Sequence, residues 1–263
     1  MGDTRLLAVI SRYAPNIVEV MVRVGRRSWL VGYLLIPLAA LLGLTLQGLR
    51  IKERERGRIG VRVLGRVRLP KPSLRGRMSV EEALARRRSR REYLEKPLTL
   101  AQVSQILWSA QGITEPTWGF RTAPSAGATY PLEVYLVVRE GGVEGLEPGV
   151  YHYNPHRHEL ELIRRGDYSL ELMAACLDQS WVGEAAVNLV ITAIYERTTK
   201  WYGERGYRYV YMEVGHVGEN VYLQCEALGL GCVVIGAFYD GEVKEILGVE
   251  EEPMYVIPVG YPR

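Results

Sequence analysis

The sequence predicts an α+β fold, and three observations support it. Segments with the patterns of strands and of helices alternate irregularly between residues 79 and 263, without a repeat. Val150–Tyr153 and Glu159–Ile163 flank Asn154-Pro155, which predicts a hairpin. Helical segments separate other strands and predict crossovers. A domain with both kinds of connection is expected to hold a mixed sheet flanked by helices.

The N-terminal part of the chain contains a run that suits a membrane. Residues 29–49 (WLVGYLLIPLAALLGLTLQGL) carry no charge and are long enough to cross a hydrocarbon core of ~30 Å as one helix. Pro37 is tolerated in such a helix, and Trp29 and Tyr33 suit an interface. The sequence therefore predicts an N-terminal segment, 1–28, and a transmembrane helix, 29–49, with a buried core helix as the alternative.

Basic side chains gather directly after this run. From Arg50 to Arg91 the sequence holds 16 basic and 4 acidic residues, although the whole chain carries a net charge of only +3. Positive residues favour the cytoplasmic side of a membrane, so the domain that follows is expected to face the cytoplasm. The stretch lacks the interleaved aromatic residues of a nucleic-acid-binding surface, and no nucleic-acid partner is predicted. Residues 50–78 are expected to form a basic linker.

Residues 79–263 are predicted to form one domain. Ser79-Val-Glu-Glu82 and Thr99-Leu-Ala-Gln102 are capping boxes, which favour helix starts, and Gly112 favours a helix end. Periodicity and punctuation predict helices over 79–88, 99–112, 169–178, 212–228 and 240–247. They predict strands over 132–139, 150–153, 159–163, 188–195, 232–238 and 254–259.

A run of arginines follows the first predicted helix. Alternating positions of an extended chain point the same way, so Arg87, Ser89 and Arg91 of the run RRRSRREY converge on one side. Arginine forks match phosphate oxygens, and a serine hydroxyl adds a donor. The run therefore indicates an anion site, with a solvated basic face as the alternative.

Two segments of small residues permit close approach of a planar ligand. Pro124, Ser125, Ala126 and Gly127 precede the strand at 132–139, and the backbone groups of such a loop can read the pyrimidine edge of an isoalloxazine ring. Farther along, a helix stop and a predicted strand lead to Gly236-Ala237, whose N–H groups could face a flavin N5. This second segment does not open a helix, so no dinucleotide-binding site is predicted. Ordinary turns are the alternative for both.

In their order and spacing, these motifs resemble the nitroreductase family of FMN-dependent oxidoreductases, and most closely its SagB-type dehydrogenase branch. The resemblance covers about residues 79–263. It rests on RRSRREY, the helix with LWSAQG, PSAGATYPLEVY, GVYHYNP, RGYRY with EVGH, and ALGLG followed by GAFYD. It implies a nitroreductase-like fold that passes hydride through FMN in a ping-pong cycle to or from a small organic substrate, with NAD(P)H as a possible donor.

The resemblance also implies a homodimer with two FMN sites at the subunit interface. The implied cofactor-binding residues are Arg87, Ser89 and Arg91 for the phosphate and ring edge, Pro124, Ser125, Ala126 and Gly127 from the partner subunit, and Gly236 and Ala237 near N5. Many relatives also carry basic residues past the last strand that help to hold the phosphate. In this chain only Arg263 remains for that task.

One departure from the family concerns proton transfer. In azoline-oxidising members a lysine directly precedes a tyrosine, and both are tied to substrate deprotonation. Here Trp201 separates Lys200 from Tyr202, and a shift of one residue turns a helical side chain by ~100°. Tyr202 and Lys200 are the catalytic candidates for proton handling. Thiazoline or oxazoline peptide dehydrogenation and a non-catalytic flavin-binding membrane protein are the alternatives to a general oxidoreductase.

The cysteines and histidines do not indicate a metal site. Cys176, Cys225 and Cys232 lack ligand spacing, and their odd number argues against a disulfide framework, so buried thiols in a reducing compartment are expected. The three histidines of the predicted hairpin have no evident carboxylate or thiolate partner in the sequence and are expected at the surface.

Overall fold

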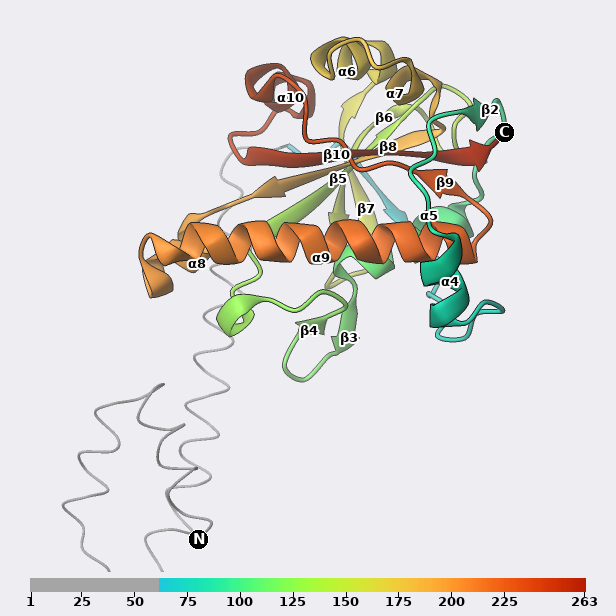
Figure 1. Cartoon of the computed structure of the whole chain (residues 1–263). Coiled ribbons are helices and arrows are strands. Elements are labelled where there is room, and N and C mark those ends of the chain that lie inside the picture. Colours follow the sequence, from blue (N-terminus) through green and yellow to red (C-terminus); the bar gives the residue numbers. More distant parts are fainter. Residues whose placement is uncertain (1–61) are drawn as a thin grey trace, which may run out of the picture. The chain divides into compact units, whose positions relative to one another are not determined.

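The computed structural model describes residues 62–263 (Figure 1). The predicted N-terminal segment, 1–28, and the predicted transmembrane helix, 29–49, lie outside the described residues, as does much of the predicted linker, 50–78. Within residues 62–263 no helix is both long and apolar enough to cross a membrane. The chain from Ile59 to Arg263 forms one compact unit.

One sheet organises this unit, with the strand order β1-β7-β6-β5-β8-β10-β2 and with β9 paired to β10. The strands are β1 (Gly65–Arg68), β2 (Tyr93–Leu94), β5 (Leu132–Val138), β6 (Gly149–Asn154), β7 (Glu159–Arg165), β8 (Val187–Ala193), β9 (Gly231–Cys232) and β10 (Glu252–Pro262). A separate hairpin joins β3 (Ile113–Glu115) to β4 (Phe120–Arg121). The predicted α+β class and the hairpin of β6 and β7 are confirmed.

The prediction of a mixed sheet is wrong for the strands that the structure describes. All their ladders are antiparallel, and the parallel pairings are isolated bridges such as the one between Ser89 and Cys232. The reason lies in the connections. Two short helices, α6 (Ser169–Ala175) and α7 (Ser180–Glu184), join β7 to β8 at one end of the sheet, so β8 runs antiparallel to β5. A helical connection gives a parallel pair only when the chain crosses back to its starting end.

Helices cover both faces of the sheet (Figure 1). On one side lie α4 (Val80–Arg86), α5 (Leu100–Gln111), α8 (Glu196–Tyr202) and α9 (Arg205–Ala227), and on the other lie α6, α7 and α10 (Asp240–Leu247). Strand β5 contributes to both cores. Val134 and Leu136 belong to the core that includes residues of α5 and α9, whereas Tyr135 and Val137 belong to the core that includes residues of α6 and α10. This alternation follows from the two-residue period of a strand.

The helix starts predicted from the two capping boxes are confirmed. The Ser79 hydroxyl accepts a hydrogen bond from the backbone amide of Glu82 at the start of α4. Thr99 and Gln102 form a reciprocal capping box at the start of α5, and Gly112 caps the end of that helix. Helix α10 has the predicted bounds. These local signals are strong because each satisfies backbone groups that a helix end leaves without partners.

Several segments differ from the prediction. Strand β1 lies inside the predicted linker and pairs with β7, so the sheet begins before Ser79. The strand expected over 232–238 pairs in β9 at its start and afterwards only through an isolated bridge between Ile235 and Val256. Helix α9 begins well before the expected residue 212, and α7 and α8 were not predicted. These helical segments are short or carry mostly exposed polar and aromatic residues, so they lack an apolar period.

Candidate functional site

The arginine run places two of its predicted site residues around one tyrosine of α9. The Ser89 hydroxyl oxygen lies 2.9 Å from the hydroxyl oxygen of Tyr222. The Arg87 guanidinium carbon lies 5.0 Å from the centroid of the Tyr222 ring. The Tyr222 hydroxyl also accepts a hydrogen bond of 3.0 Å from the backbone amide of Val234. We call Arg87, Ser89 and Tyr222 the cradle.

The intervening members of the arginine run, Arg88 and Arg90, contact Glu226 and not Tyr222. The backbone amide of Arg88 donates to Glu226, and the Arg88 guanidinium donates to the carbonyl oxygens of Ala85 and Arg87. Arg90 lies 3.8 Å from Glu226. Within residues 62–263 no carboxylate forms a salt bridge with Arg87, so its charge remains available to an anion.

The third predicted phosphate ligand, Arg91, lies against a different element. Its guanidinium carbon is 5.6 Å from the ring centroid of Trp181 in α7. One residue before α7, the Gln179 amide donates to the carbonyl of Ala237 at 3.2 Å. The start of α7 therefore contacts both Arg91 and the predicted N5 segment. Gly236 and Ala237 are exposed, and a Cβ at Gly236 would meet no atom within 4 Å.

The predicted loop of small residues has a specific backbone conformation. Gly127 and Ala128 have φ angles of 60° and 52°, in the left-handed region. The Ser125 hydroxyl accepts a hydrogen bond of 2.9 Å from the backbone amide of Tyr130, so it serves the turn. Pro124 and Gly127 are exposed. Backbone groups on this loop are accessible, as contact with a planar ligand requires.

The predicted catalytic tyrosine lies directly against this loop. A Cβ at Gly127 would stand 2.6 Å from the hydroxyl oxygen of Tyr202, so a larger residue there would displace the phenol. Two further contacts join α8 to the loop. The hydroxyls of Thr129 and Thr198 lie 2.8 Å apart, and the Arg197 guanidinium donates to the carbonyl of Tyr130 at 3.2 Å. The fold thus brings Tyr202 and the predicted loop together.

The second catalytic candidate, Lys200, points away from the side of α8 that carries Tyr202. It is exposed, and its ammonium nitrogen lies 6.0 Å from the centroid of the Trp201 ring. Side chains two positions apart on a helix point to different sides. Lys200 and Tyr202 therefore leave α8 in different directions.

A buried ion chain underlies the loop and α8. Arg197 and Glu133 form a salt bridge of 2.6 Å, and the other carboxylate oxygen of Glu133 lies 2.8 Å from the His152 ring. Glu161 approaches the same ring at 3.4 Å. The expectation that the hairpin histidines are surface residues without carboxylate partners is wrong for His152, which is buried at 3% exposure. Glu161 faces the ring from the partner strand of the same hairpin, and Glu133 reaches it from β5, which the sequence pattern does not place beside β6.

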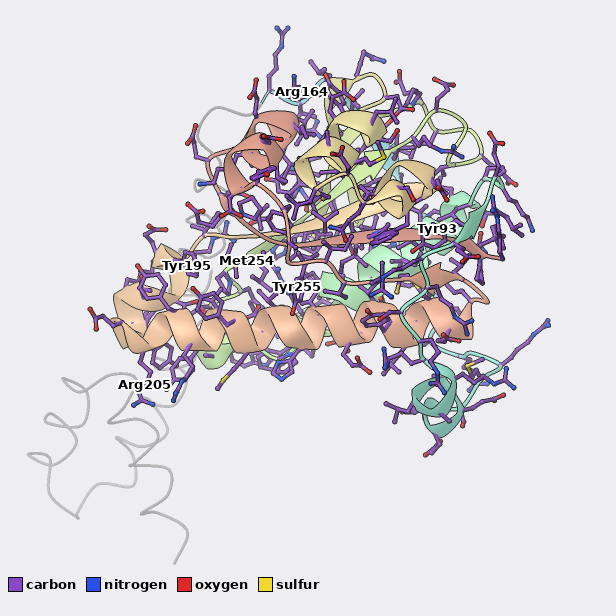
Figure 2. The ribbon with its side chains drawn as sticks, turned by 45° about the horizontal axis from the view of Figure 1, so that its top comes forward. Tyr93, Arg164, Tyr195, Arg205, Met254 and Tyr255 are labelled. Atoms are coloured by element: carbon purple, nitrogen blue, oxygen red, sulfur yellow. The ribbon has the colours of Figure 1, made fainter. Side chains whose placement is uncertain are left out.

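The start of α9 packs on the sheet through tyrosines, as Figure 2 shows. The Tyr195 hydroxyl donates to the sulfur of Met254, 3.3 Å away on β10. The Tyr195 ring also contacts the rings of Tyr207 and Tyr211. Tyr255 packs under the middle of α9, where a Cβ at Gly218 would lie 3.2 Å from its ring. These contacts hold α9 close to the sheet.

The predicted site residues fall into two groups at different ends of α9. Tyr202 and the loop lie beside Tyr209 in the N-terminal half of that helix, whereas the cradle includes Tyr222 near its C-terminal end. Helix α4 packs at that C-terminal end (Figure 1). The Tyr202 ring packs on Tyr209 of α9, and the rise of this helix from Tyr209 to Tyr222 is about 20 Å. One chain therefore does not bring the two groups together.

A cavity of about 370 Å³ lies between α4, α5 and α9. Its lining includes Trp108, Ser109, Thr122 and Asn220, and none of the predicted site residues contributes to it. Among residues 62–263 no group of three or more His, Cys, Asp or Glu residues is arranged to hold a metal ion. The three cysteines are buried free thiols, as predicted.

Sequence reasoning missed Tyr222, Trp181 and Gln179. Tyr222 lies 133 residues from its partner Ser89, and nothing in its own surroundings in the sequence distinguishes it from the other tyrosines. Trp181 belongs to a five-residue helix that has no capping side chain. Only the packing of distant elements brings these residues into contact with the predicted site residues.

Comparisons of the sequence and of the structure with known proteins find nitroreductases. The model described as Nitroreductase family matches residues 84–261. A protein of Methanocaldococcus jannaschii, provisionally named nitroreductase, is 52% identical over 183 residues, which cover 70% of this chain and 91% of that protein. A provisionally named nitroreductase structure from Ralstonia eutropha has a TM-score of 0.65 and 31% identity, covering 75% of this chain and 90% of that chain.

Similarity also extends to microcin synthesis. The microcin B17-processing protein of Escherichia coli is 29% identical over 157 residues, which span 59% of this chain and just over half, 58%, of that protein. A chain in the structure of the E. coli microcin synthetase complex with truncated pro-microcin B17 bound has a TM-score of 0.58 and 25% identity. That match covers 73% of this chain and 76% of that chain.

Proposed function

This chain belongs to the nitroreductase family, near its SagB-type members, and we propose that it is an FMN-dependent oxidoreductase. The proposed reaction is a ping-pong hydride transfer to or from a small organic substrate, with NAD(P)H as a possible donor. One observation carries the proposal. Arg87 and Ser89 gather around Tyr222, which is in turn bonded to the segment that leads to Gly236.

The residues present fit the phosphate of FMN. A phosphate offers several strong acceptor oxygens and a negative charge, and arginine forks and hydroxyls are its usual partners. Arg87 and Arg91 each stack on an aromatic ring, which holds the guanidinium without neutralising it. In this proposal Arg87, Ser89 and Arg91 hold the phosphate, and the backbone of Gly236 and Ala237 approaches the ring.

The separation of the two groups along α9 supports a homodimer. The cradle and the loop lie about 20 Å apart along α9, so in this proposal each site combines the cradle of one chain with the loop of its partner. The surface of α9 suits such an interface. Tyr211 and Met212 are 56% and 53% exposed, and a Cβ at Gly215 would meet nothing within 4 Å. Large exposed apolar residues on one helix commonly mark a protein interface.

FMN, when bound, would accept a hydride and pass it on. The chain's own residues would orient the substrate and manage its protons. Helix α8 holds the Tyr202 hydroxyl at the loop. The Tyr202 ring lies edge-on to the Tyr209 ring, with the two ring centroids 5.0 Å apart. We propose Tyr202 as the group that exchanges a proton with the substrate. Lys200, which faces another direction, is proposed to act at a distance by its positive charge.

Location is a separate proposal. The uncharged run at 29–49 and the basic residues after it support a single-pass anchor with the catalytic domain on the cytoplasmic side. Such an anchor would keep the domain near substrates that partition into the membrane. Protease accessibility of the domain in sealed inverted and right-side-out vesicles tests this topology.

Peptide azoline dehydrogenation is the second candidate, and the similarity to the microcin B17-processing protein favours it. The displaced Lys200 weighs against it, because the lysine and tyrosine of such enzymes act on one substrate. Assay of the purified chain with a thiazoline-containing peptide distinguishes the two functions. Conversion to the azole with flavin reduction would favour the second candidate.

The visible absorption spectrum of the full chain, purified in detergent, tests the central proposal. The wild-type chain is expected to carry the two absorption bands of bound flavin. Arg87→Ala and Arg91→Ala should lose most of the flavin, because each removes a fork to the phosphate. Arg88→Ala is the matched control, since Arg88 bonds to backbone carbonyls of its own helix end, and it should keep the flavin.

Each result of this measurement has a distinct meaning. Bound flavin that NADH, NADPH or an organic donor bleaches supports an enzyme. Retained flavin without turnover with any donor would instead indicate a carrier or sensor. A wild-type chain that stays colourless after reconstitution with FMN would contradict the proposal.

A further inference from the structure

We propose that Tyr222 is a positioning residue that makes the site select a phosphorylated flavin over riboflavin. The inference rests on the proposed function, because it concerns the same site. It goes further in assigning the selectivity to a residue outside the arginine run. Three contacts of the one side chain carry it: with Ser89, with Arg87 and with Val234.

The Tyr222 hydroxyl has two neighbours with different requirements. The backbone amide of Val234 can only donate, so the tyrosine oxygen is the acceptor of that 3.0 Å bond. The tyrosine proton is then available to the Ser89 oxygen, 2.9 Å away. With Tyr222 as donor, Ser89 keeps its own proton for an anion. The phenol therefore turns the serine into a donor toward the phosphate.

The Tyr222 ring has a second effect, on Arg87. The guanidinium carbon lies 5.0 Å from the ring centroid, within the range of a cation–π contact. A carboxylate at this place would compete with phosphate for the N–H groups. An aromatic face attracts the cation and leaves those groups free to bind oxygen. One side chain thus orients both donors of the cradle.

Tyr222 also connects the cradle to the predicted ring end of the site. Val234 stands two residues before Gly236, and Ile235 between them exchanges backbone hydrogen bonds of 2.9 and 3.0 Å with Val256. The hydroxyl that orients Ser89 therefore also holds the start of this segment. Loss of the hydroxyl should loosen the phosphate contacts first, since the bridge of Ile235 to β10 remains.

The test compares two ligands that differ only in the phosphate. FMN and riboflavin are titrated separately onto the flavin-free full chain, and flavin fluorescence gives each affinity. Tyr222→Phe keeps the ring and removes the hydroxyl. FMN affinity is expected to fall about tenfold and riboflavin affinity to change less than about twofold, because hydrogen bonds to a charged group contribute most. The affinity ratio therefore falls.

Ser89→Ala should lower the ratio in the same way, and the double variant should lose little more, because both changes remove one shared contact. Tyr151→Phe is the matched control. It removes a hydroxyl that bonds to the Glu147 carbonyl elsewhere in the sheet, and it should leave both affinities unchanged. Thermal unfolding of each flavin-free variant checks that it is folded.

Two outcomes would overturn the inference. An unchanged ratio in Tyr222→Phe would show that the hydroxyl has no bearing on the phosphate. An equal loss of both ligands would show a general structural role. If Tyr222→Phe does not fold, the comparison of Ser89→Ala with Ser89→Thr replaces it, because only the threonine keeps a hydroxyl. Equal ratios of FMN affinity to riboflavin affinity in these two variants would also overturn the inference. A wild-type chain that binds neither flavin would refute the proposed function itself.

Discussion

Gly127 shows how one missing side chain shapes the site. Its φ angle of 60° lies in the left-handed region, and the Tyr202 hydroxyl occupies the space that a Cβ would need. Gly119 has a similar φ angle of 69°, but a Cβ there would meet nothing within 4 Å. The two glycines therefore separate the effect of backbone strain from that of the contact with Tyr202.

Gly127→Ala is predicted to destabilise the domain by about 2–3 kcal/mol and to reduce turnover, because strain and the displacement of Tyr202 add together. Gly119→Ala should cost only about 1–2 kcal/mol, the strain alone, with normal turnover. Urea unfolding and steady-state kinetics measure both. Equal effects of the two substitutions on turnover would show that the contact between Gly127 and Tyr202 is unimportant.

The candidate site was predictable where a local rule applies. The two-residue period of extended chain placed Arg87 and Ser89 on one side, and the structure finds them at the same tyrosine. The supporting residues follow no local rule. Tyr222 and Trp181 reach the site from helices far along the chain, and only the packing of α7 and α9 defines their roles.

At the scale of elements, a histidine joins the segment that follows β1 to helix α5. The His158 ring bonds through Nε2 to the carbonyl of Pro70, at 2.9 Å, and to the Ser104 hydroxyl, at 2.8 Å. Its Nδ1 lies 2.9 Å from the Tyr153 hydroxyl. A neutral ring with its proton on Nε2 shares that proton between the Pro70 carbonyl and the Ser104 oxygen, while the Ser104 hydroxyl donates to the Pro70 carbonyl and Tyr153 donates to Nδ1. This contact holds the chain that leaves β1 against α5.

The hydrogen bonds of His158 predict that the stability of the domain depends on pH. Burial lowers the pKa of His158 below its ordinary value, and the bond to Pro70 opposes this only in part. A histidine whose pKa is lowered by folding stabilises the fold above the unfolded pKa of about 6.5 and loses this contribution as the pH falls below it. The unfolding free energy should therefore decrease on acidification in the wild type and less so in His158→Gln.

Urea unfolding at several pH values on either side of the ordinary histidine pKa measures this difference. His156→Gln, in the same turn but exposed, is the control and should keep the wild-type slope. If the unfolding free energies of the wild type and of His158→Gln change with pH in parallel, His158 does not contribute to the pH dependence.

Most elements were predictable because local forces specify them. Thr99 and Gln102 satisfy the start of α5 within four residues, and β6 and β7 meet through a short turn. The segment 233–238 was not predictable. Its apolar residues suit a strand, but its backbone pairs with β10 only at Ile235, and a pairing partner is a property of the sheet and not of the segment.

At the scale of the whole molecule, the length of α9 is the main argument for the proposed dimer. The loop and Tyr202 lie beside the N-terminal half of this helix, and the cradle lies near its C-terminal end, about 20 Å away. In the proposed dimer, a two-fold axis perpendicular to α9 near its middle would bring each end of this helix near the opposite end of its partner. The two cradles and the two loops of such a dimer would then form two complete sites.

Co-expression of two differently tagged, inactive chains tests this account most directly. One chain carries Arg87→Ala in the cradle, and the other carries Tyr202→Phe at the loop. In a mixed dimer one site receives both changes and the other receives neither. Random pairing should therefore restore about a quarter of the wild-type flavin turnover per chain, and the isolated mixed dimer about half. Mixed dimers that are no more active than either parent would contradict a site shared between two chains.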